Sequence, residues 1–153
     1  MASDKEMEAF NRWVGYLPRL DAIPDRELVV LKVHVIAEDA LHHLLALRLD
    51  VEEGPLRERR SRFADLLAVA LPKPSDKPLR DALRHLNDAR NSAAHRNEDP
   101  EFDNQVKLFV DSARRLEDGK RDIASQDPLE MVKQAGVHAI YAVYIKASEL
   151  WKL

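Results

Sequence analysis

The chain has 153 residues, of which 45% are hydrophobic and 33% charged, the balance of one ordinary globular domain over residues 1–153. A formal net charge of -3 gives no overall attraction for nucleic acid, so a polyanion would need a local basic patch. The absence of cysteine excludes disulfides, thiolate metal ligands and cysteine nucleophiles. No apolar run is long enough to span a bilayer and the N-terminus lacks an apolar signal core, so we expect a cytoplasmic protein without membrane contact.

Glycine and proline positions predict helices and no strands. Only four glycines are present, the eight prolines fall between segments with helical periodicity, and there is no Asn-Gly or Asp-Gly turn. The predicted helices, in chain order, cover residues 3–16, 25–49 and 56–71, a segment that opens at Ser75, and residues 102–116 and 127–151. We therefore predict an all-α fold, an antiparallel bundle of about four main helices plus one or two short ones.

The second predicted helix is apolar on two opposite faces. One face carries Leu28, Leu31, Val35, Leu45 and Leu49, and the other carries Val29, Val33, Ile36, Ala40 and Leu47. A helix with two apolar faces needs cover on both sides. It is either a central helix of the monomer or a helix with one face in the core and the other in a homodimer interface.

The fourth predicted helix carries the residues with the clearest chemical potential. At about 100° per residue, its apolar face holds Leu79, Leu83, Leu86, Ala93 and Ala94. Arg90 falls inside this face, where a guanidinium must find an anion or a polar cavity. Asn91 and His95 are four residues apart, so they share the adjacent flank, which Asn87 and Arg84 continue.

Arginine, amide and imidazole at one helix end suit phosphodiester chemistry on RNA without a metal. Histidine can transfer protons near neutral pH, and arginine binds phosphate through two donors. The alternative is structural, with Arg90 paired to a carboxylate and His95 at the C-terminal end of the helix, before Asp99-Pro100.

The segment Arg90-Asn91-Ser92-Ala93-Ala94-His95 resembles the signature of the HEPN superfamily, an arginine, a polar residue next to it, and a histidine after four intervening residues. The resemblance covers roughly residues 28–96. It implies an HEPN-like bundle that often dimerises, with the motifs of two subunits facing one cleft. Active members are metal-independent endoribonucleases, and many are bacterial toxins or abortive-infection effectors.

What the resemblance implies for this chain can be stated residue by residue. Arg90, Asn91 and His95 would be catalytic. Some members are held in check by an antitoxin protein that modifies a tyrosine in a His-x-Tyr sequence, but this chain has Asn97 at that position. Other HEPN proteins are non-catalytic binding modules, and the motif does not separate the two classes.

A second constellation lies on the second helix, where His34, Glu38 and His42 form one polar line in a largely apolar face. The two histidines are about 12 Å apart along the helix axis, so they cannot easily share one metal ion. Glu38 is expected to support the site as a carboxylate that pairs with Arg90, with Asn87 as a further supporting residue. An ordinary hydrogen-bonded or interface role remains the alternative.

A third feature is the densest basic stretch of the chain, preceded by Arg48 one helix earlier. The candidate RNA contacts are Arg57, Arg59, Arg60, Arg62 and Arg84. Such a run can also be a solvated helix face.

The function that these features favour is a metal-independent endoribonuclease of HEPN type, with no cofactor and no bound metal. The expected partners are a second copy of the chain, RNA and an antitoxin protein. The competing class is a non-catalytic regulatory or protein-interaction module on the same fold, and a metal-dependent helical-bundle enzyme is third.

Overall fold

The computed structural model describes residues 11, 14–16, 18–59, 61–94, 101–116, 123 and 125–151. Within these residues every regular element is helical, which confirms the all-α prediction. The long helices are α2 (Arg26–Leu49), α5 (Lys77–Ala94), α6 (Glu101–Arg114) and α7 (Pro128–Trp151). The short elements are α3 (Glu53–Glu58), α4 (Phe63–Ala70) and the 3-10 turn η1 (Pro74–Asp76).

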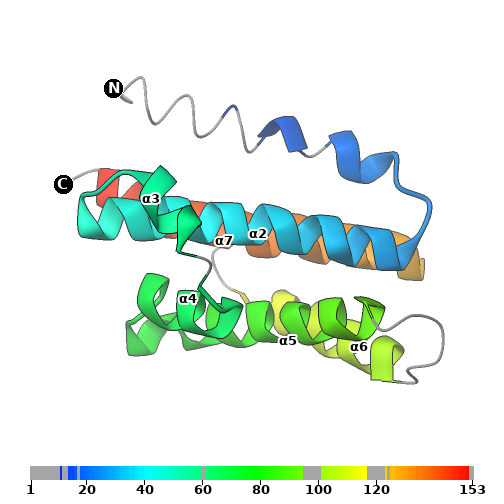
Figure 1. Ribbon diagram of the computed structural model, residues 1–153. Helices are drawn as coiled ribbons and strands as arrows, with labels where there is room; N and C mark the ends of the chain where they lie inside the picture. Colours follow the sequence, from blue (N-terminus) through cyan, green and yellow to red (C-terminus); the bar gives the residue numbers. More distant parts are fainter. Residues whose placement is uncertain are drawn as a thin grey trace.

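The long helices form two layers, α2 beside α7 and α5 beside α6 (Figure 1). α2 and α7 run in the same direction: Lys133, early in α7, bonds the carbonyl oxygen of Asp21 just before α2, while Lys146 lies near the end of α7 against Asp76. α5 runs the opposite way. The antiparallel prediction is therefore right for α5 against α2 and wrong for α7 against α2, because α7 begins and ends at the same sides of the molecule as α2 (Figure 1).

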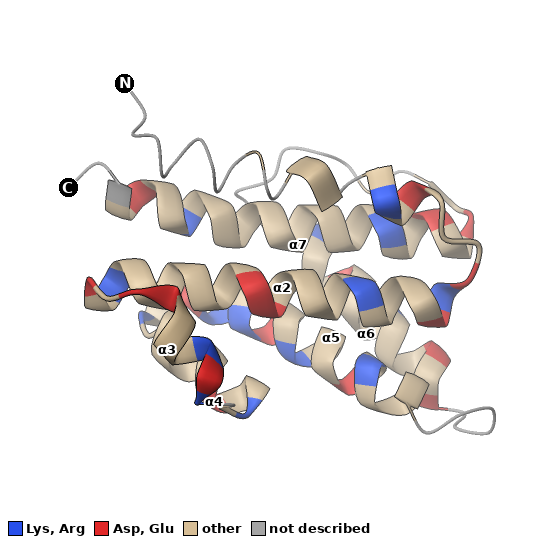
Figure 2. Ribbon diagram, turned by 45° about the horizontal axis from the view of Figure 1, so that its top comes forward, with Lys and Arg blue, Asp and Glu red and all other residues tan. Residues whose placement is uncertain are grey.

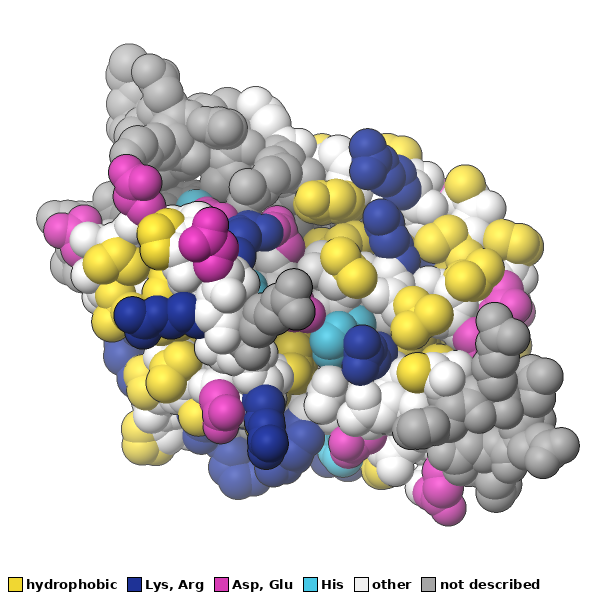
Figure 3. All heavy atoms as spheres, in the orientation of Figure 1, with side chains coloured by type: hydrophobic (Ala, Val, Ile, Leu, Met, Phe, Trp, Pro, Cys, Tyr) yellow, Lys and Arg dark blue, Asp and Glu magenta, His cyan; other side chains and the backbone are white. Residues whose placement is uncertain are grey.

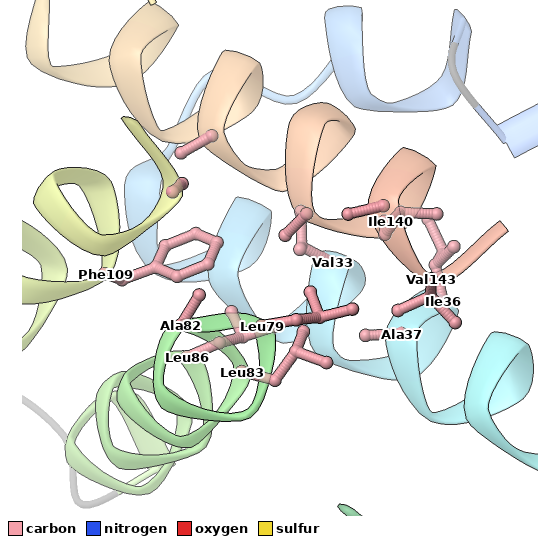
Figure 4. Close-up of a cluster of buried hydrophobic side chains, with 14 of the residues drawn as sticks. Val33, Ile36, Ala37, Leu79, Ala82, Leu83, Leu86, Phe109, Ile140 and Val143 are labelled. Atoms are coloured by element: carbon pink, nitrogen blue, oxygen red, sulfur yellow. The ribbon is translucent and has the colours of Figure 1, made fainter. Parts of the chain in front are cut away.

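The core lies where the two layers meet (Figure 4). Its central side chains include Val33, Ile36, Leu79, Leu83, Leu86, Phe109, Ile140 and Val143. Gly136 permits the close approach of α7 to α2, because a Cβ atom at this position would lie only 2.6 Å from a methyl group of Val33. Val33 is fully buried, so it has no room to give way.

The two apolar faces of α2 have different surroundings. Val29, Val33 and Ile36 are buried in the core. On the opposite face, Leu28, Val35 and Leu49 are 52%, 59% and 55% exposed, whereas Leu45 is buried and Leu31 packs against the core. α2 is therefore not a helix that its own monomer surrounds on both sides within the part of the chain that the structure describes.

The prediction of one helix over residues 56–71 is wrong in detail, because the structure divides this segment between α3 and α4. Arg59 ends α3, and Arg62 precedes α4 in an extended conformation. Two arginines then bond the carbonyl oxygens at and after the end of α4: Arg48 Nε donates to Ala70, and Arg80 donates to Leu71 and Lys73. These bonds satisfy carbonyls that a helix end leaves without partners.

Helix ends elsewhere agree with the predictions to within one or two residues. Asp25 caps α2 by accepting the N–H of Glu27 at 2.7 Å, and Asp50 ends it in the left-handed region with φ 52°. Of the first predicted helix, residues 3–10 and 12–13 lie outside the described part. Among the helices that are described, none combines the length and apolar character of a membrane-spanning segment.

Candidate functional site

The end of α5 presents polar side chains on one flank and buries small apolar ones on the other. The buried residues of this helix are Leu79, Ala82, Leu83, Leu86, Ala89 and Ala93. Arg90 and Asn91 are exposed, and so is Ala94. The prediction that Arg90 lies inside the packed face is wrong, because Ala89 occupies that position and turns Arg90 toward solvent.

Arg90 interacts with its neighbour and not with Glu38. Its Nη1 donates to the side-chain oxygen of Asn91 over 3.2 Å. Among the described residues no carboxylate forms an ion pair with Arg90, so the expected pair with Glu38 is absent there. The guanidinium and the amide therefore form a joint polar surface at the end of α5.

His34 of α2 lies against this end of α5 and is buried, with 5% of its surface exposed. Its Nε2 donates to Oδ1 of Asn87 over 3.0 Å, which ties the two helices together. Its Nδ1 faces the carboxylate of Glu38 at 3.8 Å, and its ring centroid lies 4.4 Å from that of Phe63 at the start of α4. Asn87, which the sequence suggested as a supporting residue, has this histidine as its partner.

Burial lowers the pKa of His34 below its ordinary value. The hydrogen bond with Asn87 opposes this shift, the positive charge of Arg90 adds to it, and Glu38 opposes it. The net direction is downward, so the pKa of His34 favours a neutral ring at pH 7.

The sequence alone did not predict two features of this cluster, the bond between His34 and Asn87 and the contact of Phe63 with His34. His34 and Asn87 each stand out as polar residues on largely apolar helices, and a buried polar group needs a partner. That rule could have suggested that they bond each other. Phe63 carries no such signal, because an aromatic residue at a helix start is ordinary core material.

His42, the last member of the polar line on α2, contacts its own helix. Nδ1 of His42 bonds the backbone oxygen of Glu38 on the same helix, at 2.9 Å. Within the described ranges, no group of three or more His, Asp or Glu side chains is placed to hold a metal ion.

The basic residues predicted to contact RNA divide into two groups. Arg57 contacts both Asp39 and Glu53, and Arg84 lies 2.5 Å from Asp81, so these two serve ion pairs on α2, α3 and α5. Burial would lower the pKa of Arg57, but its hydrogen bonds to Glu53 and Asp39 raise it above its usual value. Acidic and basic residues accordingly alternate along α3 (Figure 2).

Arg59 and Arg62 form the second group, because both are exposed and stand on the connection between α3 and α4. Arg62 directly precedes Phe63, whose ring contacts His34. The start of α4 is thereby held against His34, the residue that bonds Asn87 of α5. Arg60 lies outside the described residues, and so does His95, which follows Ala94, the last described residue of α5.

The surface that includes α2, α4 and α5 is mixed in character. Figure 3 shows a histidine side chain next to a basic one near the middle of this face, with hydrophobic patches around them.

A comparison of the chain with protein-family models, with curated proteins and with solved structures finds no match in any of the three.

Proposed function

We propose that the protein is a metal-independent endoribonuclease of HEPN type. The observation that carries the proposal is the exposed pair Arg90 and Asn91, which His95 follows after Ser92, Ala93 and Ala94. A structural arginine would have a carboxylate partner, and none of the described carboxylates forms an ion pair with Arg90. Within the described part of the chain its guanidinium bonds Asn91 alone, and we propose that its other donors bind an external anion.

In the proposed reaction the RNA supplies its own nucleophile. His95 takes part in the proton transfer from the 2′-hydroxyl, whose oxygen forms a bond to phosphorus. The bond from phosphorus to the 5′-oxygen breaks, that oxygen takes up a proton, and a 2′,3′-cyclic phosphate remains. Arg90 binds the phosphate and stabilises the charge that develops on it, while Asn91 orients Arg90 through their hydrogen bond.

Arg59 and Arg62 extend the binding surface for the RNA backbone. Both are exposed, and Arg62 directly precedes Phe63, whose ring contacts His34, the partner of Asn87 on α5. Arg57 and Arg84 do not belong to this surface, because their guanidinium groups serve ion pairs within the protein. Phosphate contacts of this kind supply affinity that falls with salt.

A second copy of the chain completes the proposed assembly. Leu28, Val35 and Leu49 are exposed apolar side chains of α2, and a dimer would cover them. Light scattering should give twice 17.5 kDa at micromolar concentration. A particle of 17.5 kDa alone removes the dimer from the proposal.

In the cell we propose a cytoplasmic toxin or abortive-infection effector, with an antitoxin protein as its partner. The exposed apolar face of α2 also favours a second candidate function, a non-catalytic protein-interaction module. The two candidates differ in whether RNA is cut, so one assay separates them.

The deciding experiment measures cleavage of a mixed-sequence single-stranded RNA in EDTA, between about pH 5 and 9, a range that spans the pKa of histidine. The wild type should release cyclic-phosphate ends, and Arg90→Ala and His95→Ala should each lose about 10²-fold or more in rate. Arg84→Ala is the matched control, an exposed arginine of the same helix that already pairs with Asp81. A wild type that cuts no RNA in this range rejects the ribonuclease and leaves the interaction module.

A further inference from the structure

His34 is a buried titratable residue that the proposed reaction does not use. Only 5% of its surface is exposed, although it lies one helix away from Arg90 and Asn91. Its neighbours are Glu38 from α2, Asn87 from α5 and the uncharged ring of Phe63 from α4, and Arg90, one turn after Asn87, is the nearby positive charge that lowers its pKa. Each ring nitrogen therefore has a defined neighbour.

The two nitrogens of His34 have different tasks. Nε2 donates its hydrogen to Asn87 Oδ1 at 3.0 Å, which fixes the neutral tautomer. Nδ1 then carries a lone pair that faces Glu38 Oε2 at 3.8 Å. A proton on Nδ1 would replace a repulsive contact between a lone pair and a carboxylate with an ion pair. The Glu38 side chain is 45% exposed, so solvent can deliver that proton.

The charge of Arg90 opposes this protonation. Arg90 follows Asn87 by three residues, so the two lie on the same side of α5, and the guanidinium lowers the pKa of His34. A phosphodiester bound to Arg90 would neutralise that charge. The same event would leave Glu38 as the uncompensated charge near the ring, which favours a proton on Nδ1.

We propose that His34 is a positioning residue of this site, which holds Asn87 in place and takes up one proton from solvent when Arg90 binds a phosphodiester. The inference rests on the proposed function in one respect, that Arg90 is the phosphate-binding group. It adds a regulatory property to the site, since phosphodiester binding and proton uptake at His34 strengthen each other.

The first experiment needs no ligand. NMR titration of the His34 ring should show that Arg90→Ala raises the pKa of His34, because the opposing charge is gone. Arg84→Ala, the matched control, removes an exposed arginine of the same helix that is paired with Asp81 and should leave the pKa of His34 unchanged. A pKa of His34 that is the same in all three proteins overturns the proposal.

The second experiment uses a thymidine dinucleotide, which has one phosphodiester, keeps its charge over the titration and lacks the 2′-hydroxyl needed for cleavage. The dinucleotide should raise the pKa of His34. Its affinity should increase as the pH falls from about 7.5 to 5, by at most about tenfold per pH unit, the limit for one coupled proton.

The variant His34→Gln keeps the hydrogen bond but cannot take up the proton, because its side-chain amide N–H can still donate to Asn87 while the amide does not titrate. It should bind the dinucleotide with an affinity that varies much less with pH. His138→Gln, the control, alters a buried histidine that bonds Leu116 from α7 and should keep the wild-type pH dependence. If the dinucleotide leaves the pKa of His34 unchanged, with or without measurable binding, the proposal is wrong.

Failure of this inference and failure of the proposed function have different signatures. If RNA is cut by a reaction that depends on His95, but neither Arg90→Ala nor the dinucleotide changes the pKa of His34, the inference is wrong and the proposed function stands. If the dinucleotide and His34 are coupled but no RNA is cut, only the ribonuclease falls and a phosphodiester-binding module remains.

Discussion

The two ends of α5 differ in the role of polar side chains, which are buried in contacts with the rest of the fold at the start and exposed at the end. Before its start, Asp76 in η1 is 1% exposed, accepts the backbone N–H of Lys73 at 3.1 Å and lies 3.3 Å from Nζ of Lys146 on α7. Arg80, in the first turns, donates to two backbone oxygens. Every one of these groups serves the attachment of α5 to the rest of the fold.

At the other end of α5 the polar groups face solvent. Arg90 and Asn91 are exposed and bond each other, and the bond of Asn87 to His34 is the described side-chain hydrogen bond that ties these last turns to α2. Polar side chains that stabilise a fold are buried and paired, whereas those that await a ligand are held in place but left accessible. The comparison separates the stabilising end from the candidate site.

The largest effect on stability is expected at the start of α5. Asp76→Ala removes a buried carboxylate, leaves Lys146 without this partner, and should cost about 3 kcal/mol in the free energy of unfolding. Asp81→Ala is the control, because Asp81 is 27% exposed and pairs with Lys77 and Arg84 on the surface, an arrangement worth about 1 kcal/mol or less. Urea unfolding of both variants tests the contrast, and equal losses would contradict it.

The fold was largely predictable from the sequence because its signals are local. The Asp25 cap and the Asp127-Pro128 start set helix ends that the structure keeps. The break between α3 and α4 was missed, because the segment is apolar at both ends and the connection depends on contacts such as that of Phe63 with His34. The direction of α7 was missed for a similar reason, since it follows from packing against α2.

The candidate site was predictable in composition but not in geometry. The motif identified Arg90 and Asn91, but a helical wheel cannot decide between neighbouring positions when Ala89 and Arg90 both border the apolar face. Glu38 was placed near the site, yet its neighbour is His34 and not Arg90. Which partner a buried polar group finds on another helix depends on the register between the helices, which no single segment encodes.

A smaller effect is expected where α5 meets α2. Because burial lowers the pKa of His34 in the folded protein, the unfolded chain binds more protons than the folded one just below the ordinary histidine pKa. Stability should therefore fall as the pH drops from about 7 toward 5, and the fall should be weaker in His34→Gln. Urea unfolding at several pH values measures the difference, and parallel curves for the two proteins would show that His34 does not contribute.

The smallest effect on stability is expected at Arg90. Arg90→Ala removes an exposed side chain that pairs with none of the described carboxylates, and both residues favour helix, so the change should stay within about 0.5 kcal/mol. If Arg90 instead lay in the packed face, as the helical wheel predicted, its removal would destabilise the fold strongly. Urea unfolding beside the cleavage assay gives both quantities for one variant: lost activity with unchanged stability places Arg90 in the site, whereas a loss near that of Asp76→Ala makes it a structural residue.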